Sequence, residues 1–176
     1  LREVCGLQTE AIASAFLLAP STLAQRIVRA KAKIKAAGIP YEVPGPAERA
    51  GRLASVLRVV YLVLKEGYSR QAGAATQQVE LAVEAIRLAQ LLAGLMPDEP
   101  EVHGLLALML LHDARREARV DPQGEMVLLE DQDRSAWDVA AIERGREHLS
   151  VAHELADLGP FQLEAAVAAV HATAPT

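Results

Sequence analysis

The stretch GLQTEAIASAFLLAPSTLAQRIVRAKAKIKAA, residues 6–37, decides the fold of the N-terminal part of this chain. Its first half predicts a two-turn helix with Ile12, Ala13 and Phe16 facing inward. After a short turn, a second helix is expected to begin near Pro20. The small side chain of Ala13 would let the two helices cross closely at a steep angle. The stretch therefore predicts a helix-turn-helix.

The second predicted helix has one apolar side and two exposed flanks, as its positions at 100° per residue indicate. The apolar stripe consists of Leu23, Ile27, Ala30 and Ile34. The first exposed flank consists of Thr22, Gln25, Arg26, Arg29 and Lys33. The second exposed flank consists of Ala24, Val28, Lys31 and Lys35. One side is therefore available for packing, and the rest offers cations, a Gln amide and small apolar groups.

In a helix-turn-helix the second helix enters the major groove of DNA with its N-terminal end first. Thr22, Gln25 and Arg29 would then lie nearest to base edges or neighbouring phosphates. The remaining cations, which are Arg26, Lys31, Lys33 and Lys35, would mostly meet the phosphate backbone and give affinity without sequence information. The alternative is a solvated cationic face on an ordinary helical hairpin.

The charge of the chain is distributed unevenly. Residues 1–43 hold six Arg or Lys and three Glu, a balance of +3, whereas residues 44–176 hold twelve basic and twenty acidic residues, a balance of −8. The Pro-rich stretch 38–46 breaks any helix, and we place a domain boundary there. We therefore expect a basic module over 1–43 that meets phosphate, and an acidic module over 44–176 that repels it.

The acidic module is predicted to be helical. Only 3% of the residues are aromatic while 51% are hydrophobic, which favours an all-α protein with ample core. The expected helices are 47–67, 76–95, 101–118, 135–157 and 161–172, and three of them have start signals at Pro46, Pro100 and Ser135. Between them, residues 119–131 predict a small hairpin or an irregular loop around the turn Asp121-Pro122-Gln123-Gly124.

Two architectures are open for these helices. Small residues spaced around Pro97, which include Ala85, Ala89 and Ala107, are typical of the close packing in tetratricopeptide helix pairs. No clean 34-residue period accompanies them, so a plain helical bundle is the alternative. Tyr61, Tyr68 and Trp137 are expected either as core residues with satisfied polar tips or as the lining of a concave binding groove.

The sequence lacks the residues that several other functions would require. The apolar runs 56–64 and 105–111 are too short to span a bilayer, so no membrane association is expected. The single Cys5 excludes an intrachain disulfide and fits a cytoplasmic protein. His112-Asp113 lacks further ligands for a metal-dependent phosphohydrolase, and the acidic run 130–133 does not match a calcium loop. We therefore expect no catalytic residues, no cofactor and no metal.

The second predicted helix and four later segments of the chain resemble a known protein family. Ser21-Thr22-Leu23-Ala24-Gln25-Arg26-Ile27 and Arg29-Ala30-Lys31 resemble the recognition helix in region 4 of bacterial sigma-70-type factors of the extracytoplasmic-function group. IPYEVP (39–44), VYLVLKEGYS (60–69), PDEPEVHGLLALMLLHDARREARVD (97–121) and LLEDQDRSAWD (128–138) resemble a subgroup with a C-terminal, tetratricopeptide-like helical extension. The resemblance covers nearly the whole chain.

The resemblance implies binding to RNA polymerase core and recognition of the −35 promoter element. By position, Thr22, Ala24, Gln25, Val28 and Arg29 would face DNA, although Ala24 and Val28 depart from the more polar or aromatic residues often found there. The strand-opening region of such factors is missing, and the chain lacks an initiator Met. We therefore expect a fragment of a longer polypeptide.

Three hypotheses are open for the role of the acidic module. In the first it regulates promoter output directly, and in the second it recruits a separate protein, peptide or ligand signal. In the third hypothesis the whole chain is a tetratricopeptide-like interaction scaffold with no direct role at DNA.

Overall fold

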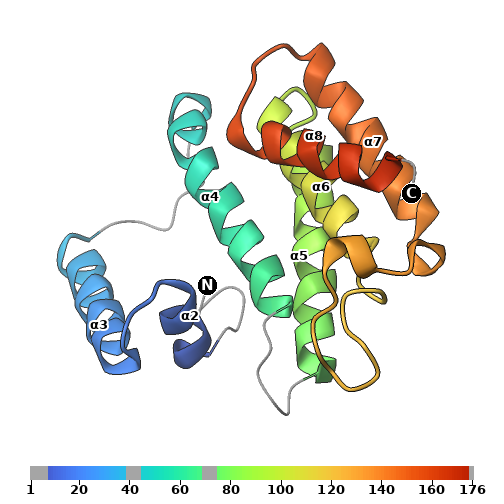
Figure 1. Ribbon diagram of the computed structural model, residues 1–176. Helices are drawn as coiled ribbons and strands as arrows, with labels where there is room; N and C mark the ends of the chain where they lie inside the picture. The colour runs from blue at the N-terminus through green and yellow to red at the C-terminus, as the bar shows by residue number, and fades with distance from the viewer. Residues whose placement is uncertain (1–7, 39–44, 69–74, 175–176) are drawn as a thin grey trace. The chain divides into compact units, whose positions relative to one another are not determined.

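The computed structural model describes residues 8–38, 45–68 and 75–174, and this part of the chain is all-α, as predicted (Figure 1). Its elements are α2 (Thr9–Ala15), α3 (Pro20–Ala36), α4 (Pro46–Gly67), α5 (Ala75–Leu95), α6 (Pro100–Asp113), η1 (Leu129–Asp131), η2 (Arg134–Ala136), α7 (Val139–Glu154) and α8 (Pro160–Thr173), where η denotes a 3-10 helix. The chain divides into two compact units, Leu1–Leu81 and Ala82–Thr176. Cys5 and residues 39–44 of the predicted linker lie outside the described residues, and the boundary placed at residue 43 stays a prediction.

Proline is the first residue of four of the seven described α-helices. Pro20, Pro46, Pro100 and Pro160 are the first residues of α3, α4, α6 and α8. Proline suits this position because its fixed φ matches the helix and its missing N–H would have no partner in the first turn. The start signals at Pro46 and Pro100 are thus confirmed.

Three predicted boundaries in the second unit are wrong, and one of them is the helix end expected at residue 157, because α7 ends at Glu154. The helix expected from Ser135 begins only at Val139, because Asp138 is the N-cap and its carboxylate accepts from the backbone N–H of Ala141 at 2.9 Å. Ser135 lies instead in the short η2, where its backbone N–H donates to the Asp133 carboxylate at 2.9 Å. The helix expected to reach residue 118 ends at Asp113, after which the chain continues in tighter turns.

Helix α6 is the centre of the second unit. Eleven of its fourteen residues are buried, and it packs against both α7 and α8. Two glycines allow these close contacts. A Cβ on Gly104 would lie 2.6 Å from Cγ of Gln162 on α8, and a Cβ on Gly145 of α7 would lie 3.0 Å from Cγ of Leu111. The glycines therefore set how near α8 and α7 come to α6.

The beginning of α8 is bound by a side chain from α6. The Glu101 carboxylate accepts from the backbone N–H of Phe161 at 3.1 Å and from that of Gln162 at 3.2 Å. Gly159, the residue before α8, gives this carboxylate room, because a Cβ there would overlap it. Glu101 thus satisfies N–H groups that have no partner inside the helix and places a negative charge at the positive end of its dipole.

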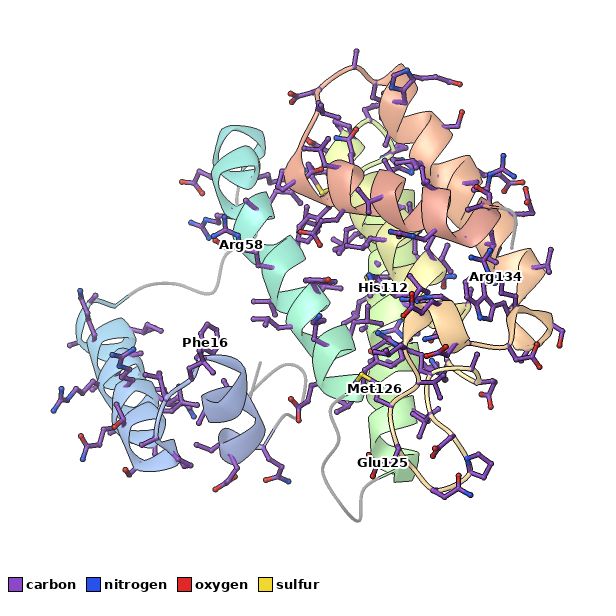
Figure 2. The ribbon with its side chains drawn as sticks, in the orientation of Figure 1. Phe16, Arg58, His112, Glu125, Met126 and Arg134 are labelled. Carbon is purple, nitrogen blue, oxygen red and sulfur yellow. The ribbon has the colours of Figure 1, made fainter. Side chains whose placement is uncertain are left out.

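The segment between α6 and η1 is an irregular loop that contains the predicted turn. The backbone N–H of Gly124 donates to the Asp121 carbonyl at 2.9 Å, and Gly124 has a φ of 84°. An isolated antiparallel bridge joins Val120 and Met126. Glu125 and Met126 lie in this loop (Figure 2), and Met126 is exposed. The backbone N–H of Asp121 donates to the Glu125 carbonyl and that of Val127 to the Arg119 carbonyl, both at 2.9 Å, so the loop has the hydrogen bonds of a minimal hairpin without forming strands.

Helix α4 belongs to the first unit and is apolar along most of its length. Leu57, Val63 and Leu64 are each at most 1% exposed, whereas Arg58 is exposed (Figure 2).

No helix within the described ranges is long and apolar enough to cross a lipid bilayer.

Candidate nucleic-acid interface

Helices α2 and α3 form a pair with a small apolar interior. Ile12 and Ala13 of α2 and Leu23 of α3 are buried. The chain turns between the helices at Leu17, whose φ is 53°, and the backbone N–H of Leu18 donates to the Ala13 carbonyl at 2.8 Å. The predicted pair of helices around a short break is confirmed, and Ala13 is fully buried.

Two details of the predicted packing are wrong. Phe16 is 49% exposed instead of facing inward, because α2 ends at Ala15 and Phe16 belongs to the turn (Figure 2). The apolar stripe of α3 is covered only at its N-terminal end, since Ile27 is half-buried and Ile34 is 52% exposed. The reason is length: α2 has 7 residues and α3 has 17, so α2 spans less than half of α3.

All nine residues predicted to contact DNA lie on α3, on the parts of its surface that α2 leaves open. Eight of them are exposed and Ala24 is half-buried. The exposed ones are Thr22, Gln25, Arg26, Val28, Arg29, Lys31, Lys33 and Lys35. The structure therefore brings the predicted residues together on one element, with their side chains accessible to a partner.

The charge on α3 is of one sign. The helix carries five Arg or Lys and no acidic residue among its 17 residues. Within the described part of the chain, no ion pair involves Arg26, Arg29, Lys33 or Lys35. Lys33 and Lys35 occupy the last turn, where cations also stabilise the negative end of the helix dipole. That stabilisation accounts for these two lysines but leaves Arg26 and Arg29, farther from the end, unexplained.

The exposed side chains of α3 match the groups that DNA presents. A helix of this length extends over about 25 Å, and the major groove is about 12 Å wide and admits an α-helix. The Gln25 amide can pair with adenine, and the Arg29 guanidinium can pair with guanine or a phosphate. Ala24 and Val28 have no hydrogen-bonding side chain, so their contacts would be apolar, as with a thymine methyl group.

The residues considered for enzymatic chemistry have structural partners. Asp113 is the last residue of α6 and forms an ion pair with Arg116. Its neighbour His112 projects from the last turn of that helix (Figure 2). Among residues 8–38, 45–68 and 75–174, no three His, Cys, Asp or Glu side chains lie together in a way that could hold a metal ion.

A pair of histidines was missed by the sequence reasoning. His103 on α6 and His148 on α7 face each other with their Nδ1 atoms 3.0 Å apart, and Nε2 of His103 lies 2.9 Å from the Pro97 carbonyl. Because a carbonyl only accepts, His103 donates from Nε2 and its Nδ1 accepts from His148. Burial and, to a lesser degree, electrostatic repulsion from the neighbouring His103 lower the pKa of His148 from 6.5, opposed by Glu147. The two residues are 45 positions apart, so no local pattern indicated the contact.

Trp137 is a core residue, one of the two predicted alternatives. It is 6% exposed, and the guanidinium groups of Arg134 and Arg115 lie 4.9 Å and 5.9 Å from the centre of its ring. Its indole nitrogen has no hydrogen-bond partner among the described residues, so the expectation of a satisfied polar tip is wrong. Asp133 caps η2, and Arg134 donates to the Ala174 carbonyl.

A protein-family model matches the region that follows the helix pair. A model of a family of unknown function, DUF6596, matches residues 52–153, which is more than half of the chain. The chain belongs to the DUF6596 family. The DUF6596 match begins within α4, after α2 and α3, and ends within α7.

The whole chain is also similar to an uncharacterized protein of Rhizobium meliloti (strain 1021). The two are 48% identical over 174 residues, which is 99% of this chain and 41% of the relative. The chain thus spans about two-fifths of the length of that relative. No solved structure matches the chain.

Proposed function

We propose that this chain belongs to a transcription initiation factor of the sigma-70 type, extracytoplasmic-function group, and that α3 contacts the −35 promoter element. The observation that supports this most directly is the surface of α3, which is exposed, cationic and free of acidic residues. In this proposal the factor acts in the cytoplasm on RNA polymerase core, which holds α3 at the promoter.

The proposed contacts divide into two groups. Thr22, Gln25 and Arg29 read base edges or adjacent phosphates. The phosphate contacts come from Arg26, Lys31, Lys33 and Lys35. If about four cations neutralise phosphates, the logarithm of the binding constant falls with the logarithm of salt concentration at a slope of roughly −3 to −4.

The second unit is proposed to regulate the factor or to recruit a partner. Residues 82–176 contain seven Arg or Lys and seventeen Asp or Glu, a balance of −10. Such a surface repels the phosphate backbone. The DNA contacts are therefore assigned to α3, and the second unit is assigned to protein, peptide or small-molecule partners.

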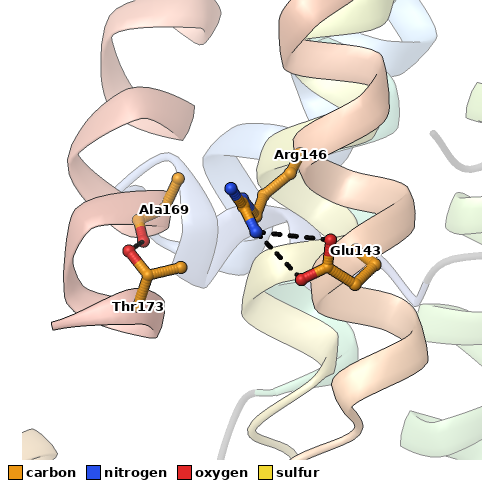
Figure 3. A network of polar contacts seen from close by, with 4 residues as sticks. All are labelled: Glu143, Arg146, Ala169 and Thr173. Carbon is orange, nitrogen blue, oxygen red and sulfur yellow. Dashed lines mark hydrogen bonds and ion pairs between the residues drawn. The ribbon is translucent and has the colours of Figure 1, made fainter. Parts of the chain in front are cut away.

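The test is the binding of the purified chain to a fluorescent DNA duplex, followed by anisotropy over a series of salt concentrations. Arg29→Glu should weaken binding and make the salt slope shallower by at least about one. The matched control is Arg146→Glu, which reverses a charge of the same kind on the second unit. Arg146 lies on the surface of α7 and pairs with Glu143 at 3.0 Å (Figure 3). Its reversal should leave the slope unchanged.

A second measurement tests sequence recognition. From a pool of random duplexes bound to the chain together with RNA polymerase core, Gln25→Ala should select sites with relaxed preference at one position. A flat salt dependence, or equal effects of the Arg29 and Arg146 reversals, would contradict the proposal. The interaction scaffold without a role at DNA would then be the better account.

A further inference from the structure

A groove with a volume of about 400 Å³ lies in the second unit between α6, α8 and η1. Its walls are largely apolar. Leu163 and Val167 line it from α8 and are 54% and 60% exposed, and Leu129 lines it from η1. Leu108, which is buried in α6, forms part of its floor. Large apolar side chains that remain exposed beside a hollow are typical of a surface that a ligand covers.

The basic side chains of the groove gather at one end. Near the beginnings of both helices, Gly104 of α6 contacts Gln162 of α8, so the groove extends from there toward the ends of the two helices. His112 lies in the last turn of α6, and His171 lies in the last turn of α8. Arg115, just beyond α6, also lines the groove. The three groups of the groove that can carry positive charge therefore lie in or just beyond the last turns of the two helices.

The acidic group of the groove lies toward the other end. Glu164 precedes His171 by seven residues on the same side of α8, which separates their backbones by about 10 Å. An anion in the groove is thus repelled at the Glu164 end and attracted at the Arg115 end. The basic cluster is unusual for its surroundings, because this unit is strongly acidic.

We propose that this groove binds a small amphipathic carboxylate, with the carboxylate at Arg115, His112 and His171. The apolar chain of the ligand would lie along Leu163 and Val167, with its tail toward the beginning of α8. Three observations support a ligand of this class. The volume lies within the range of small-molecule sites, the walls are apolar with a few convergent polar groups, and the cationic end matches a carboxylate. The proposal does not depend on promoter binding by α3.

The groove has a built-in reporter. Arg115 lines the groove and its guanidinium also lies 5.9 Å from the ring of Trp137, the single tryptophan of the chain. A carboxylate that pairs with Arg115 changes the charge next to the indole. Binding should therefore alter the fluorescence of Trp137, which gives a readout independent of calorimetry.

The experiment compares three probes that share an eight-carbon chain and differ in charge. Octanoate, 1-octanol and octylamine are each titrated into the purified chain, with heat and Trp137 fluorescence as readouts. Octanoate should bind at least about tenfold more tightly than octylamine, since the basic cluster attracts the first and repels the second. The neutral 1-octanol should lie between them and change the fluorescence less than octanoate does.

Two matched variants locate the site. Val167→Asp introduces a negative charge into the groove and should weaken octanoate binding at least about tenfold. Val170→Asp makes the same change on the same helix, but Val170 is 66% exposed and does not line the groove. That variant should bind octanoate as the native chain does. Both positions are exposed, so both variants are expected to fold, which circular dichroism checks.

Four outcomes would overturn the proposal. Octanoate could fail to bind below its micelle concentration, or the three probes could bind equally well. Equal losses in Val167→Asp and Val170→Asp would indicate unspecific adsorption to α8. Finally, sedimentation could show a dimer that Val167→Asp dissociates and octanoate does not, in which case a second copy of the chain covers the groove.

Discussion

Helices α3 and α6 are similar in length, with 17 and 14 residues, but they use their side chains differently. α6 has eleven buried residues and packs against α7 and α8, whereas Leu23 is the one buried residue described on α3. Burial of apolar surface is the main source of stability, so α6 carries much of the stability of its unit. α3 contributes little stability and leaves most of its side chains available for contacts. Substitutions in the two helices should therefore differ in what they impair.

The largest difference is expected from removing apolar volume. Leu106→Ala in α6 should lower the free energy of unfolding by about 2–5 kcal/mol, because Leu106 is 1% exposed and its loss leaves a cavity. Ile34→Ala in α3 should change it by less than about 0.5 kcal/mol, because Ile34 is 52% exposed. Urea unfolding followed by circular dichroism measures both. Comparable losses at the two positions would mean that the face of α3 is covered after all.

The next effect concerns the contact between α6 and α8. Gly104→Val should destabilise the chain by about 1–3 kcal/mol, because the added Cβ would lie 2.8 Å from the backbone nitrogen of Gln162 and α8 would have to move. The control is Gly94→Ala on α5, where an added Cβ would have no atom within 4 Å other than those of its chain neighbours and its own helix backbone. That change should stabilise the helix by roughly 0.5–1 kcal/mol. A neutral Gly104→Val would show that α6 and α8 separate easily.

The smallest expected effect is a dependence on pH that arises in α6 and α7. The pKa of His148 is lowered from 6.5 in the folded chain, so the unfolded chain binds more protons as the pH falls. The free energy of unfolding should therefore have its full value above about pH 6.5. It should decrease as the pH falls from there toward the pKa of His148 in the folded chain. Glu147 on the same helix opposes this shift, and the Pro97 carbonyl holds the partner ring of His103.

Urea unfolding at several pH values between about 7.5 and 5.5 measures this dependence. His148→Gln should flatten it, because the variant has no imidazole to protonate at that position. Ser150→Gln, an exposed change on the same helix, should retain the native dependence. If His148→Gln also retained the native dependence, the histidine pair would not be its source.

Local signals in the sequence were sufficient for the order of the helices. Proline fixes φ and lacks an N–H, so Pro46 and Pro100 marked helix starts whatever surrounded them. The apolar stripe of α3 could also be predicted from the sequence, because it depends only on the 3.6-residue period of a helix. Ser135 failed as a start because Asp133 and Asp138 are competing N-caps nearby, and sequence alone did not decide between them.

Contacts between distant residues could not be predicted in this way. The apolar stripe of α3 is visible in the sequence, but the length of the helix that covers it decides how much of the stripe is buried. His103 and His148 come together only because α6 packs against α7. The groove likewise combines Leu108 with His171, which no helical period relates.

The Glu101 carboxylate that accepts from the start of α8 has a consequence for how the unit opens. The N–H groups of Phe161 and Gln162 are bound by a residue 60 and 61 positions earlier, and no side chain of the preceding residue caps them. The first turn of α8 therefore cannot keep these hydrogen bonds unless α6 is in place. Amide hydrogens at most helix ends exchange with solvent through local fraying, but these two should exchange only when α8 leaves α6. Their exchange rates would then report the separation of the two helices that form the groove.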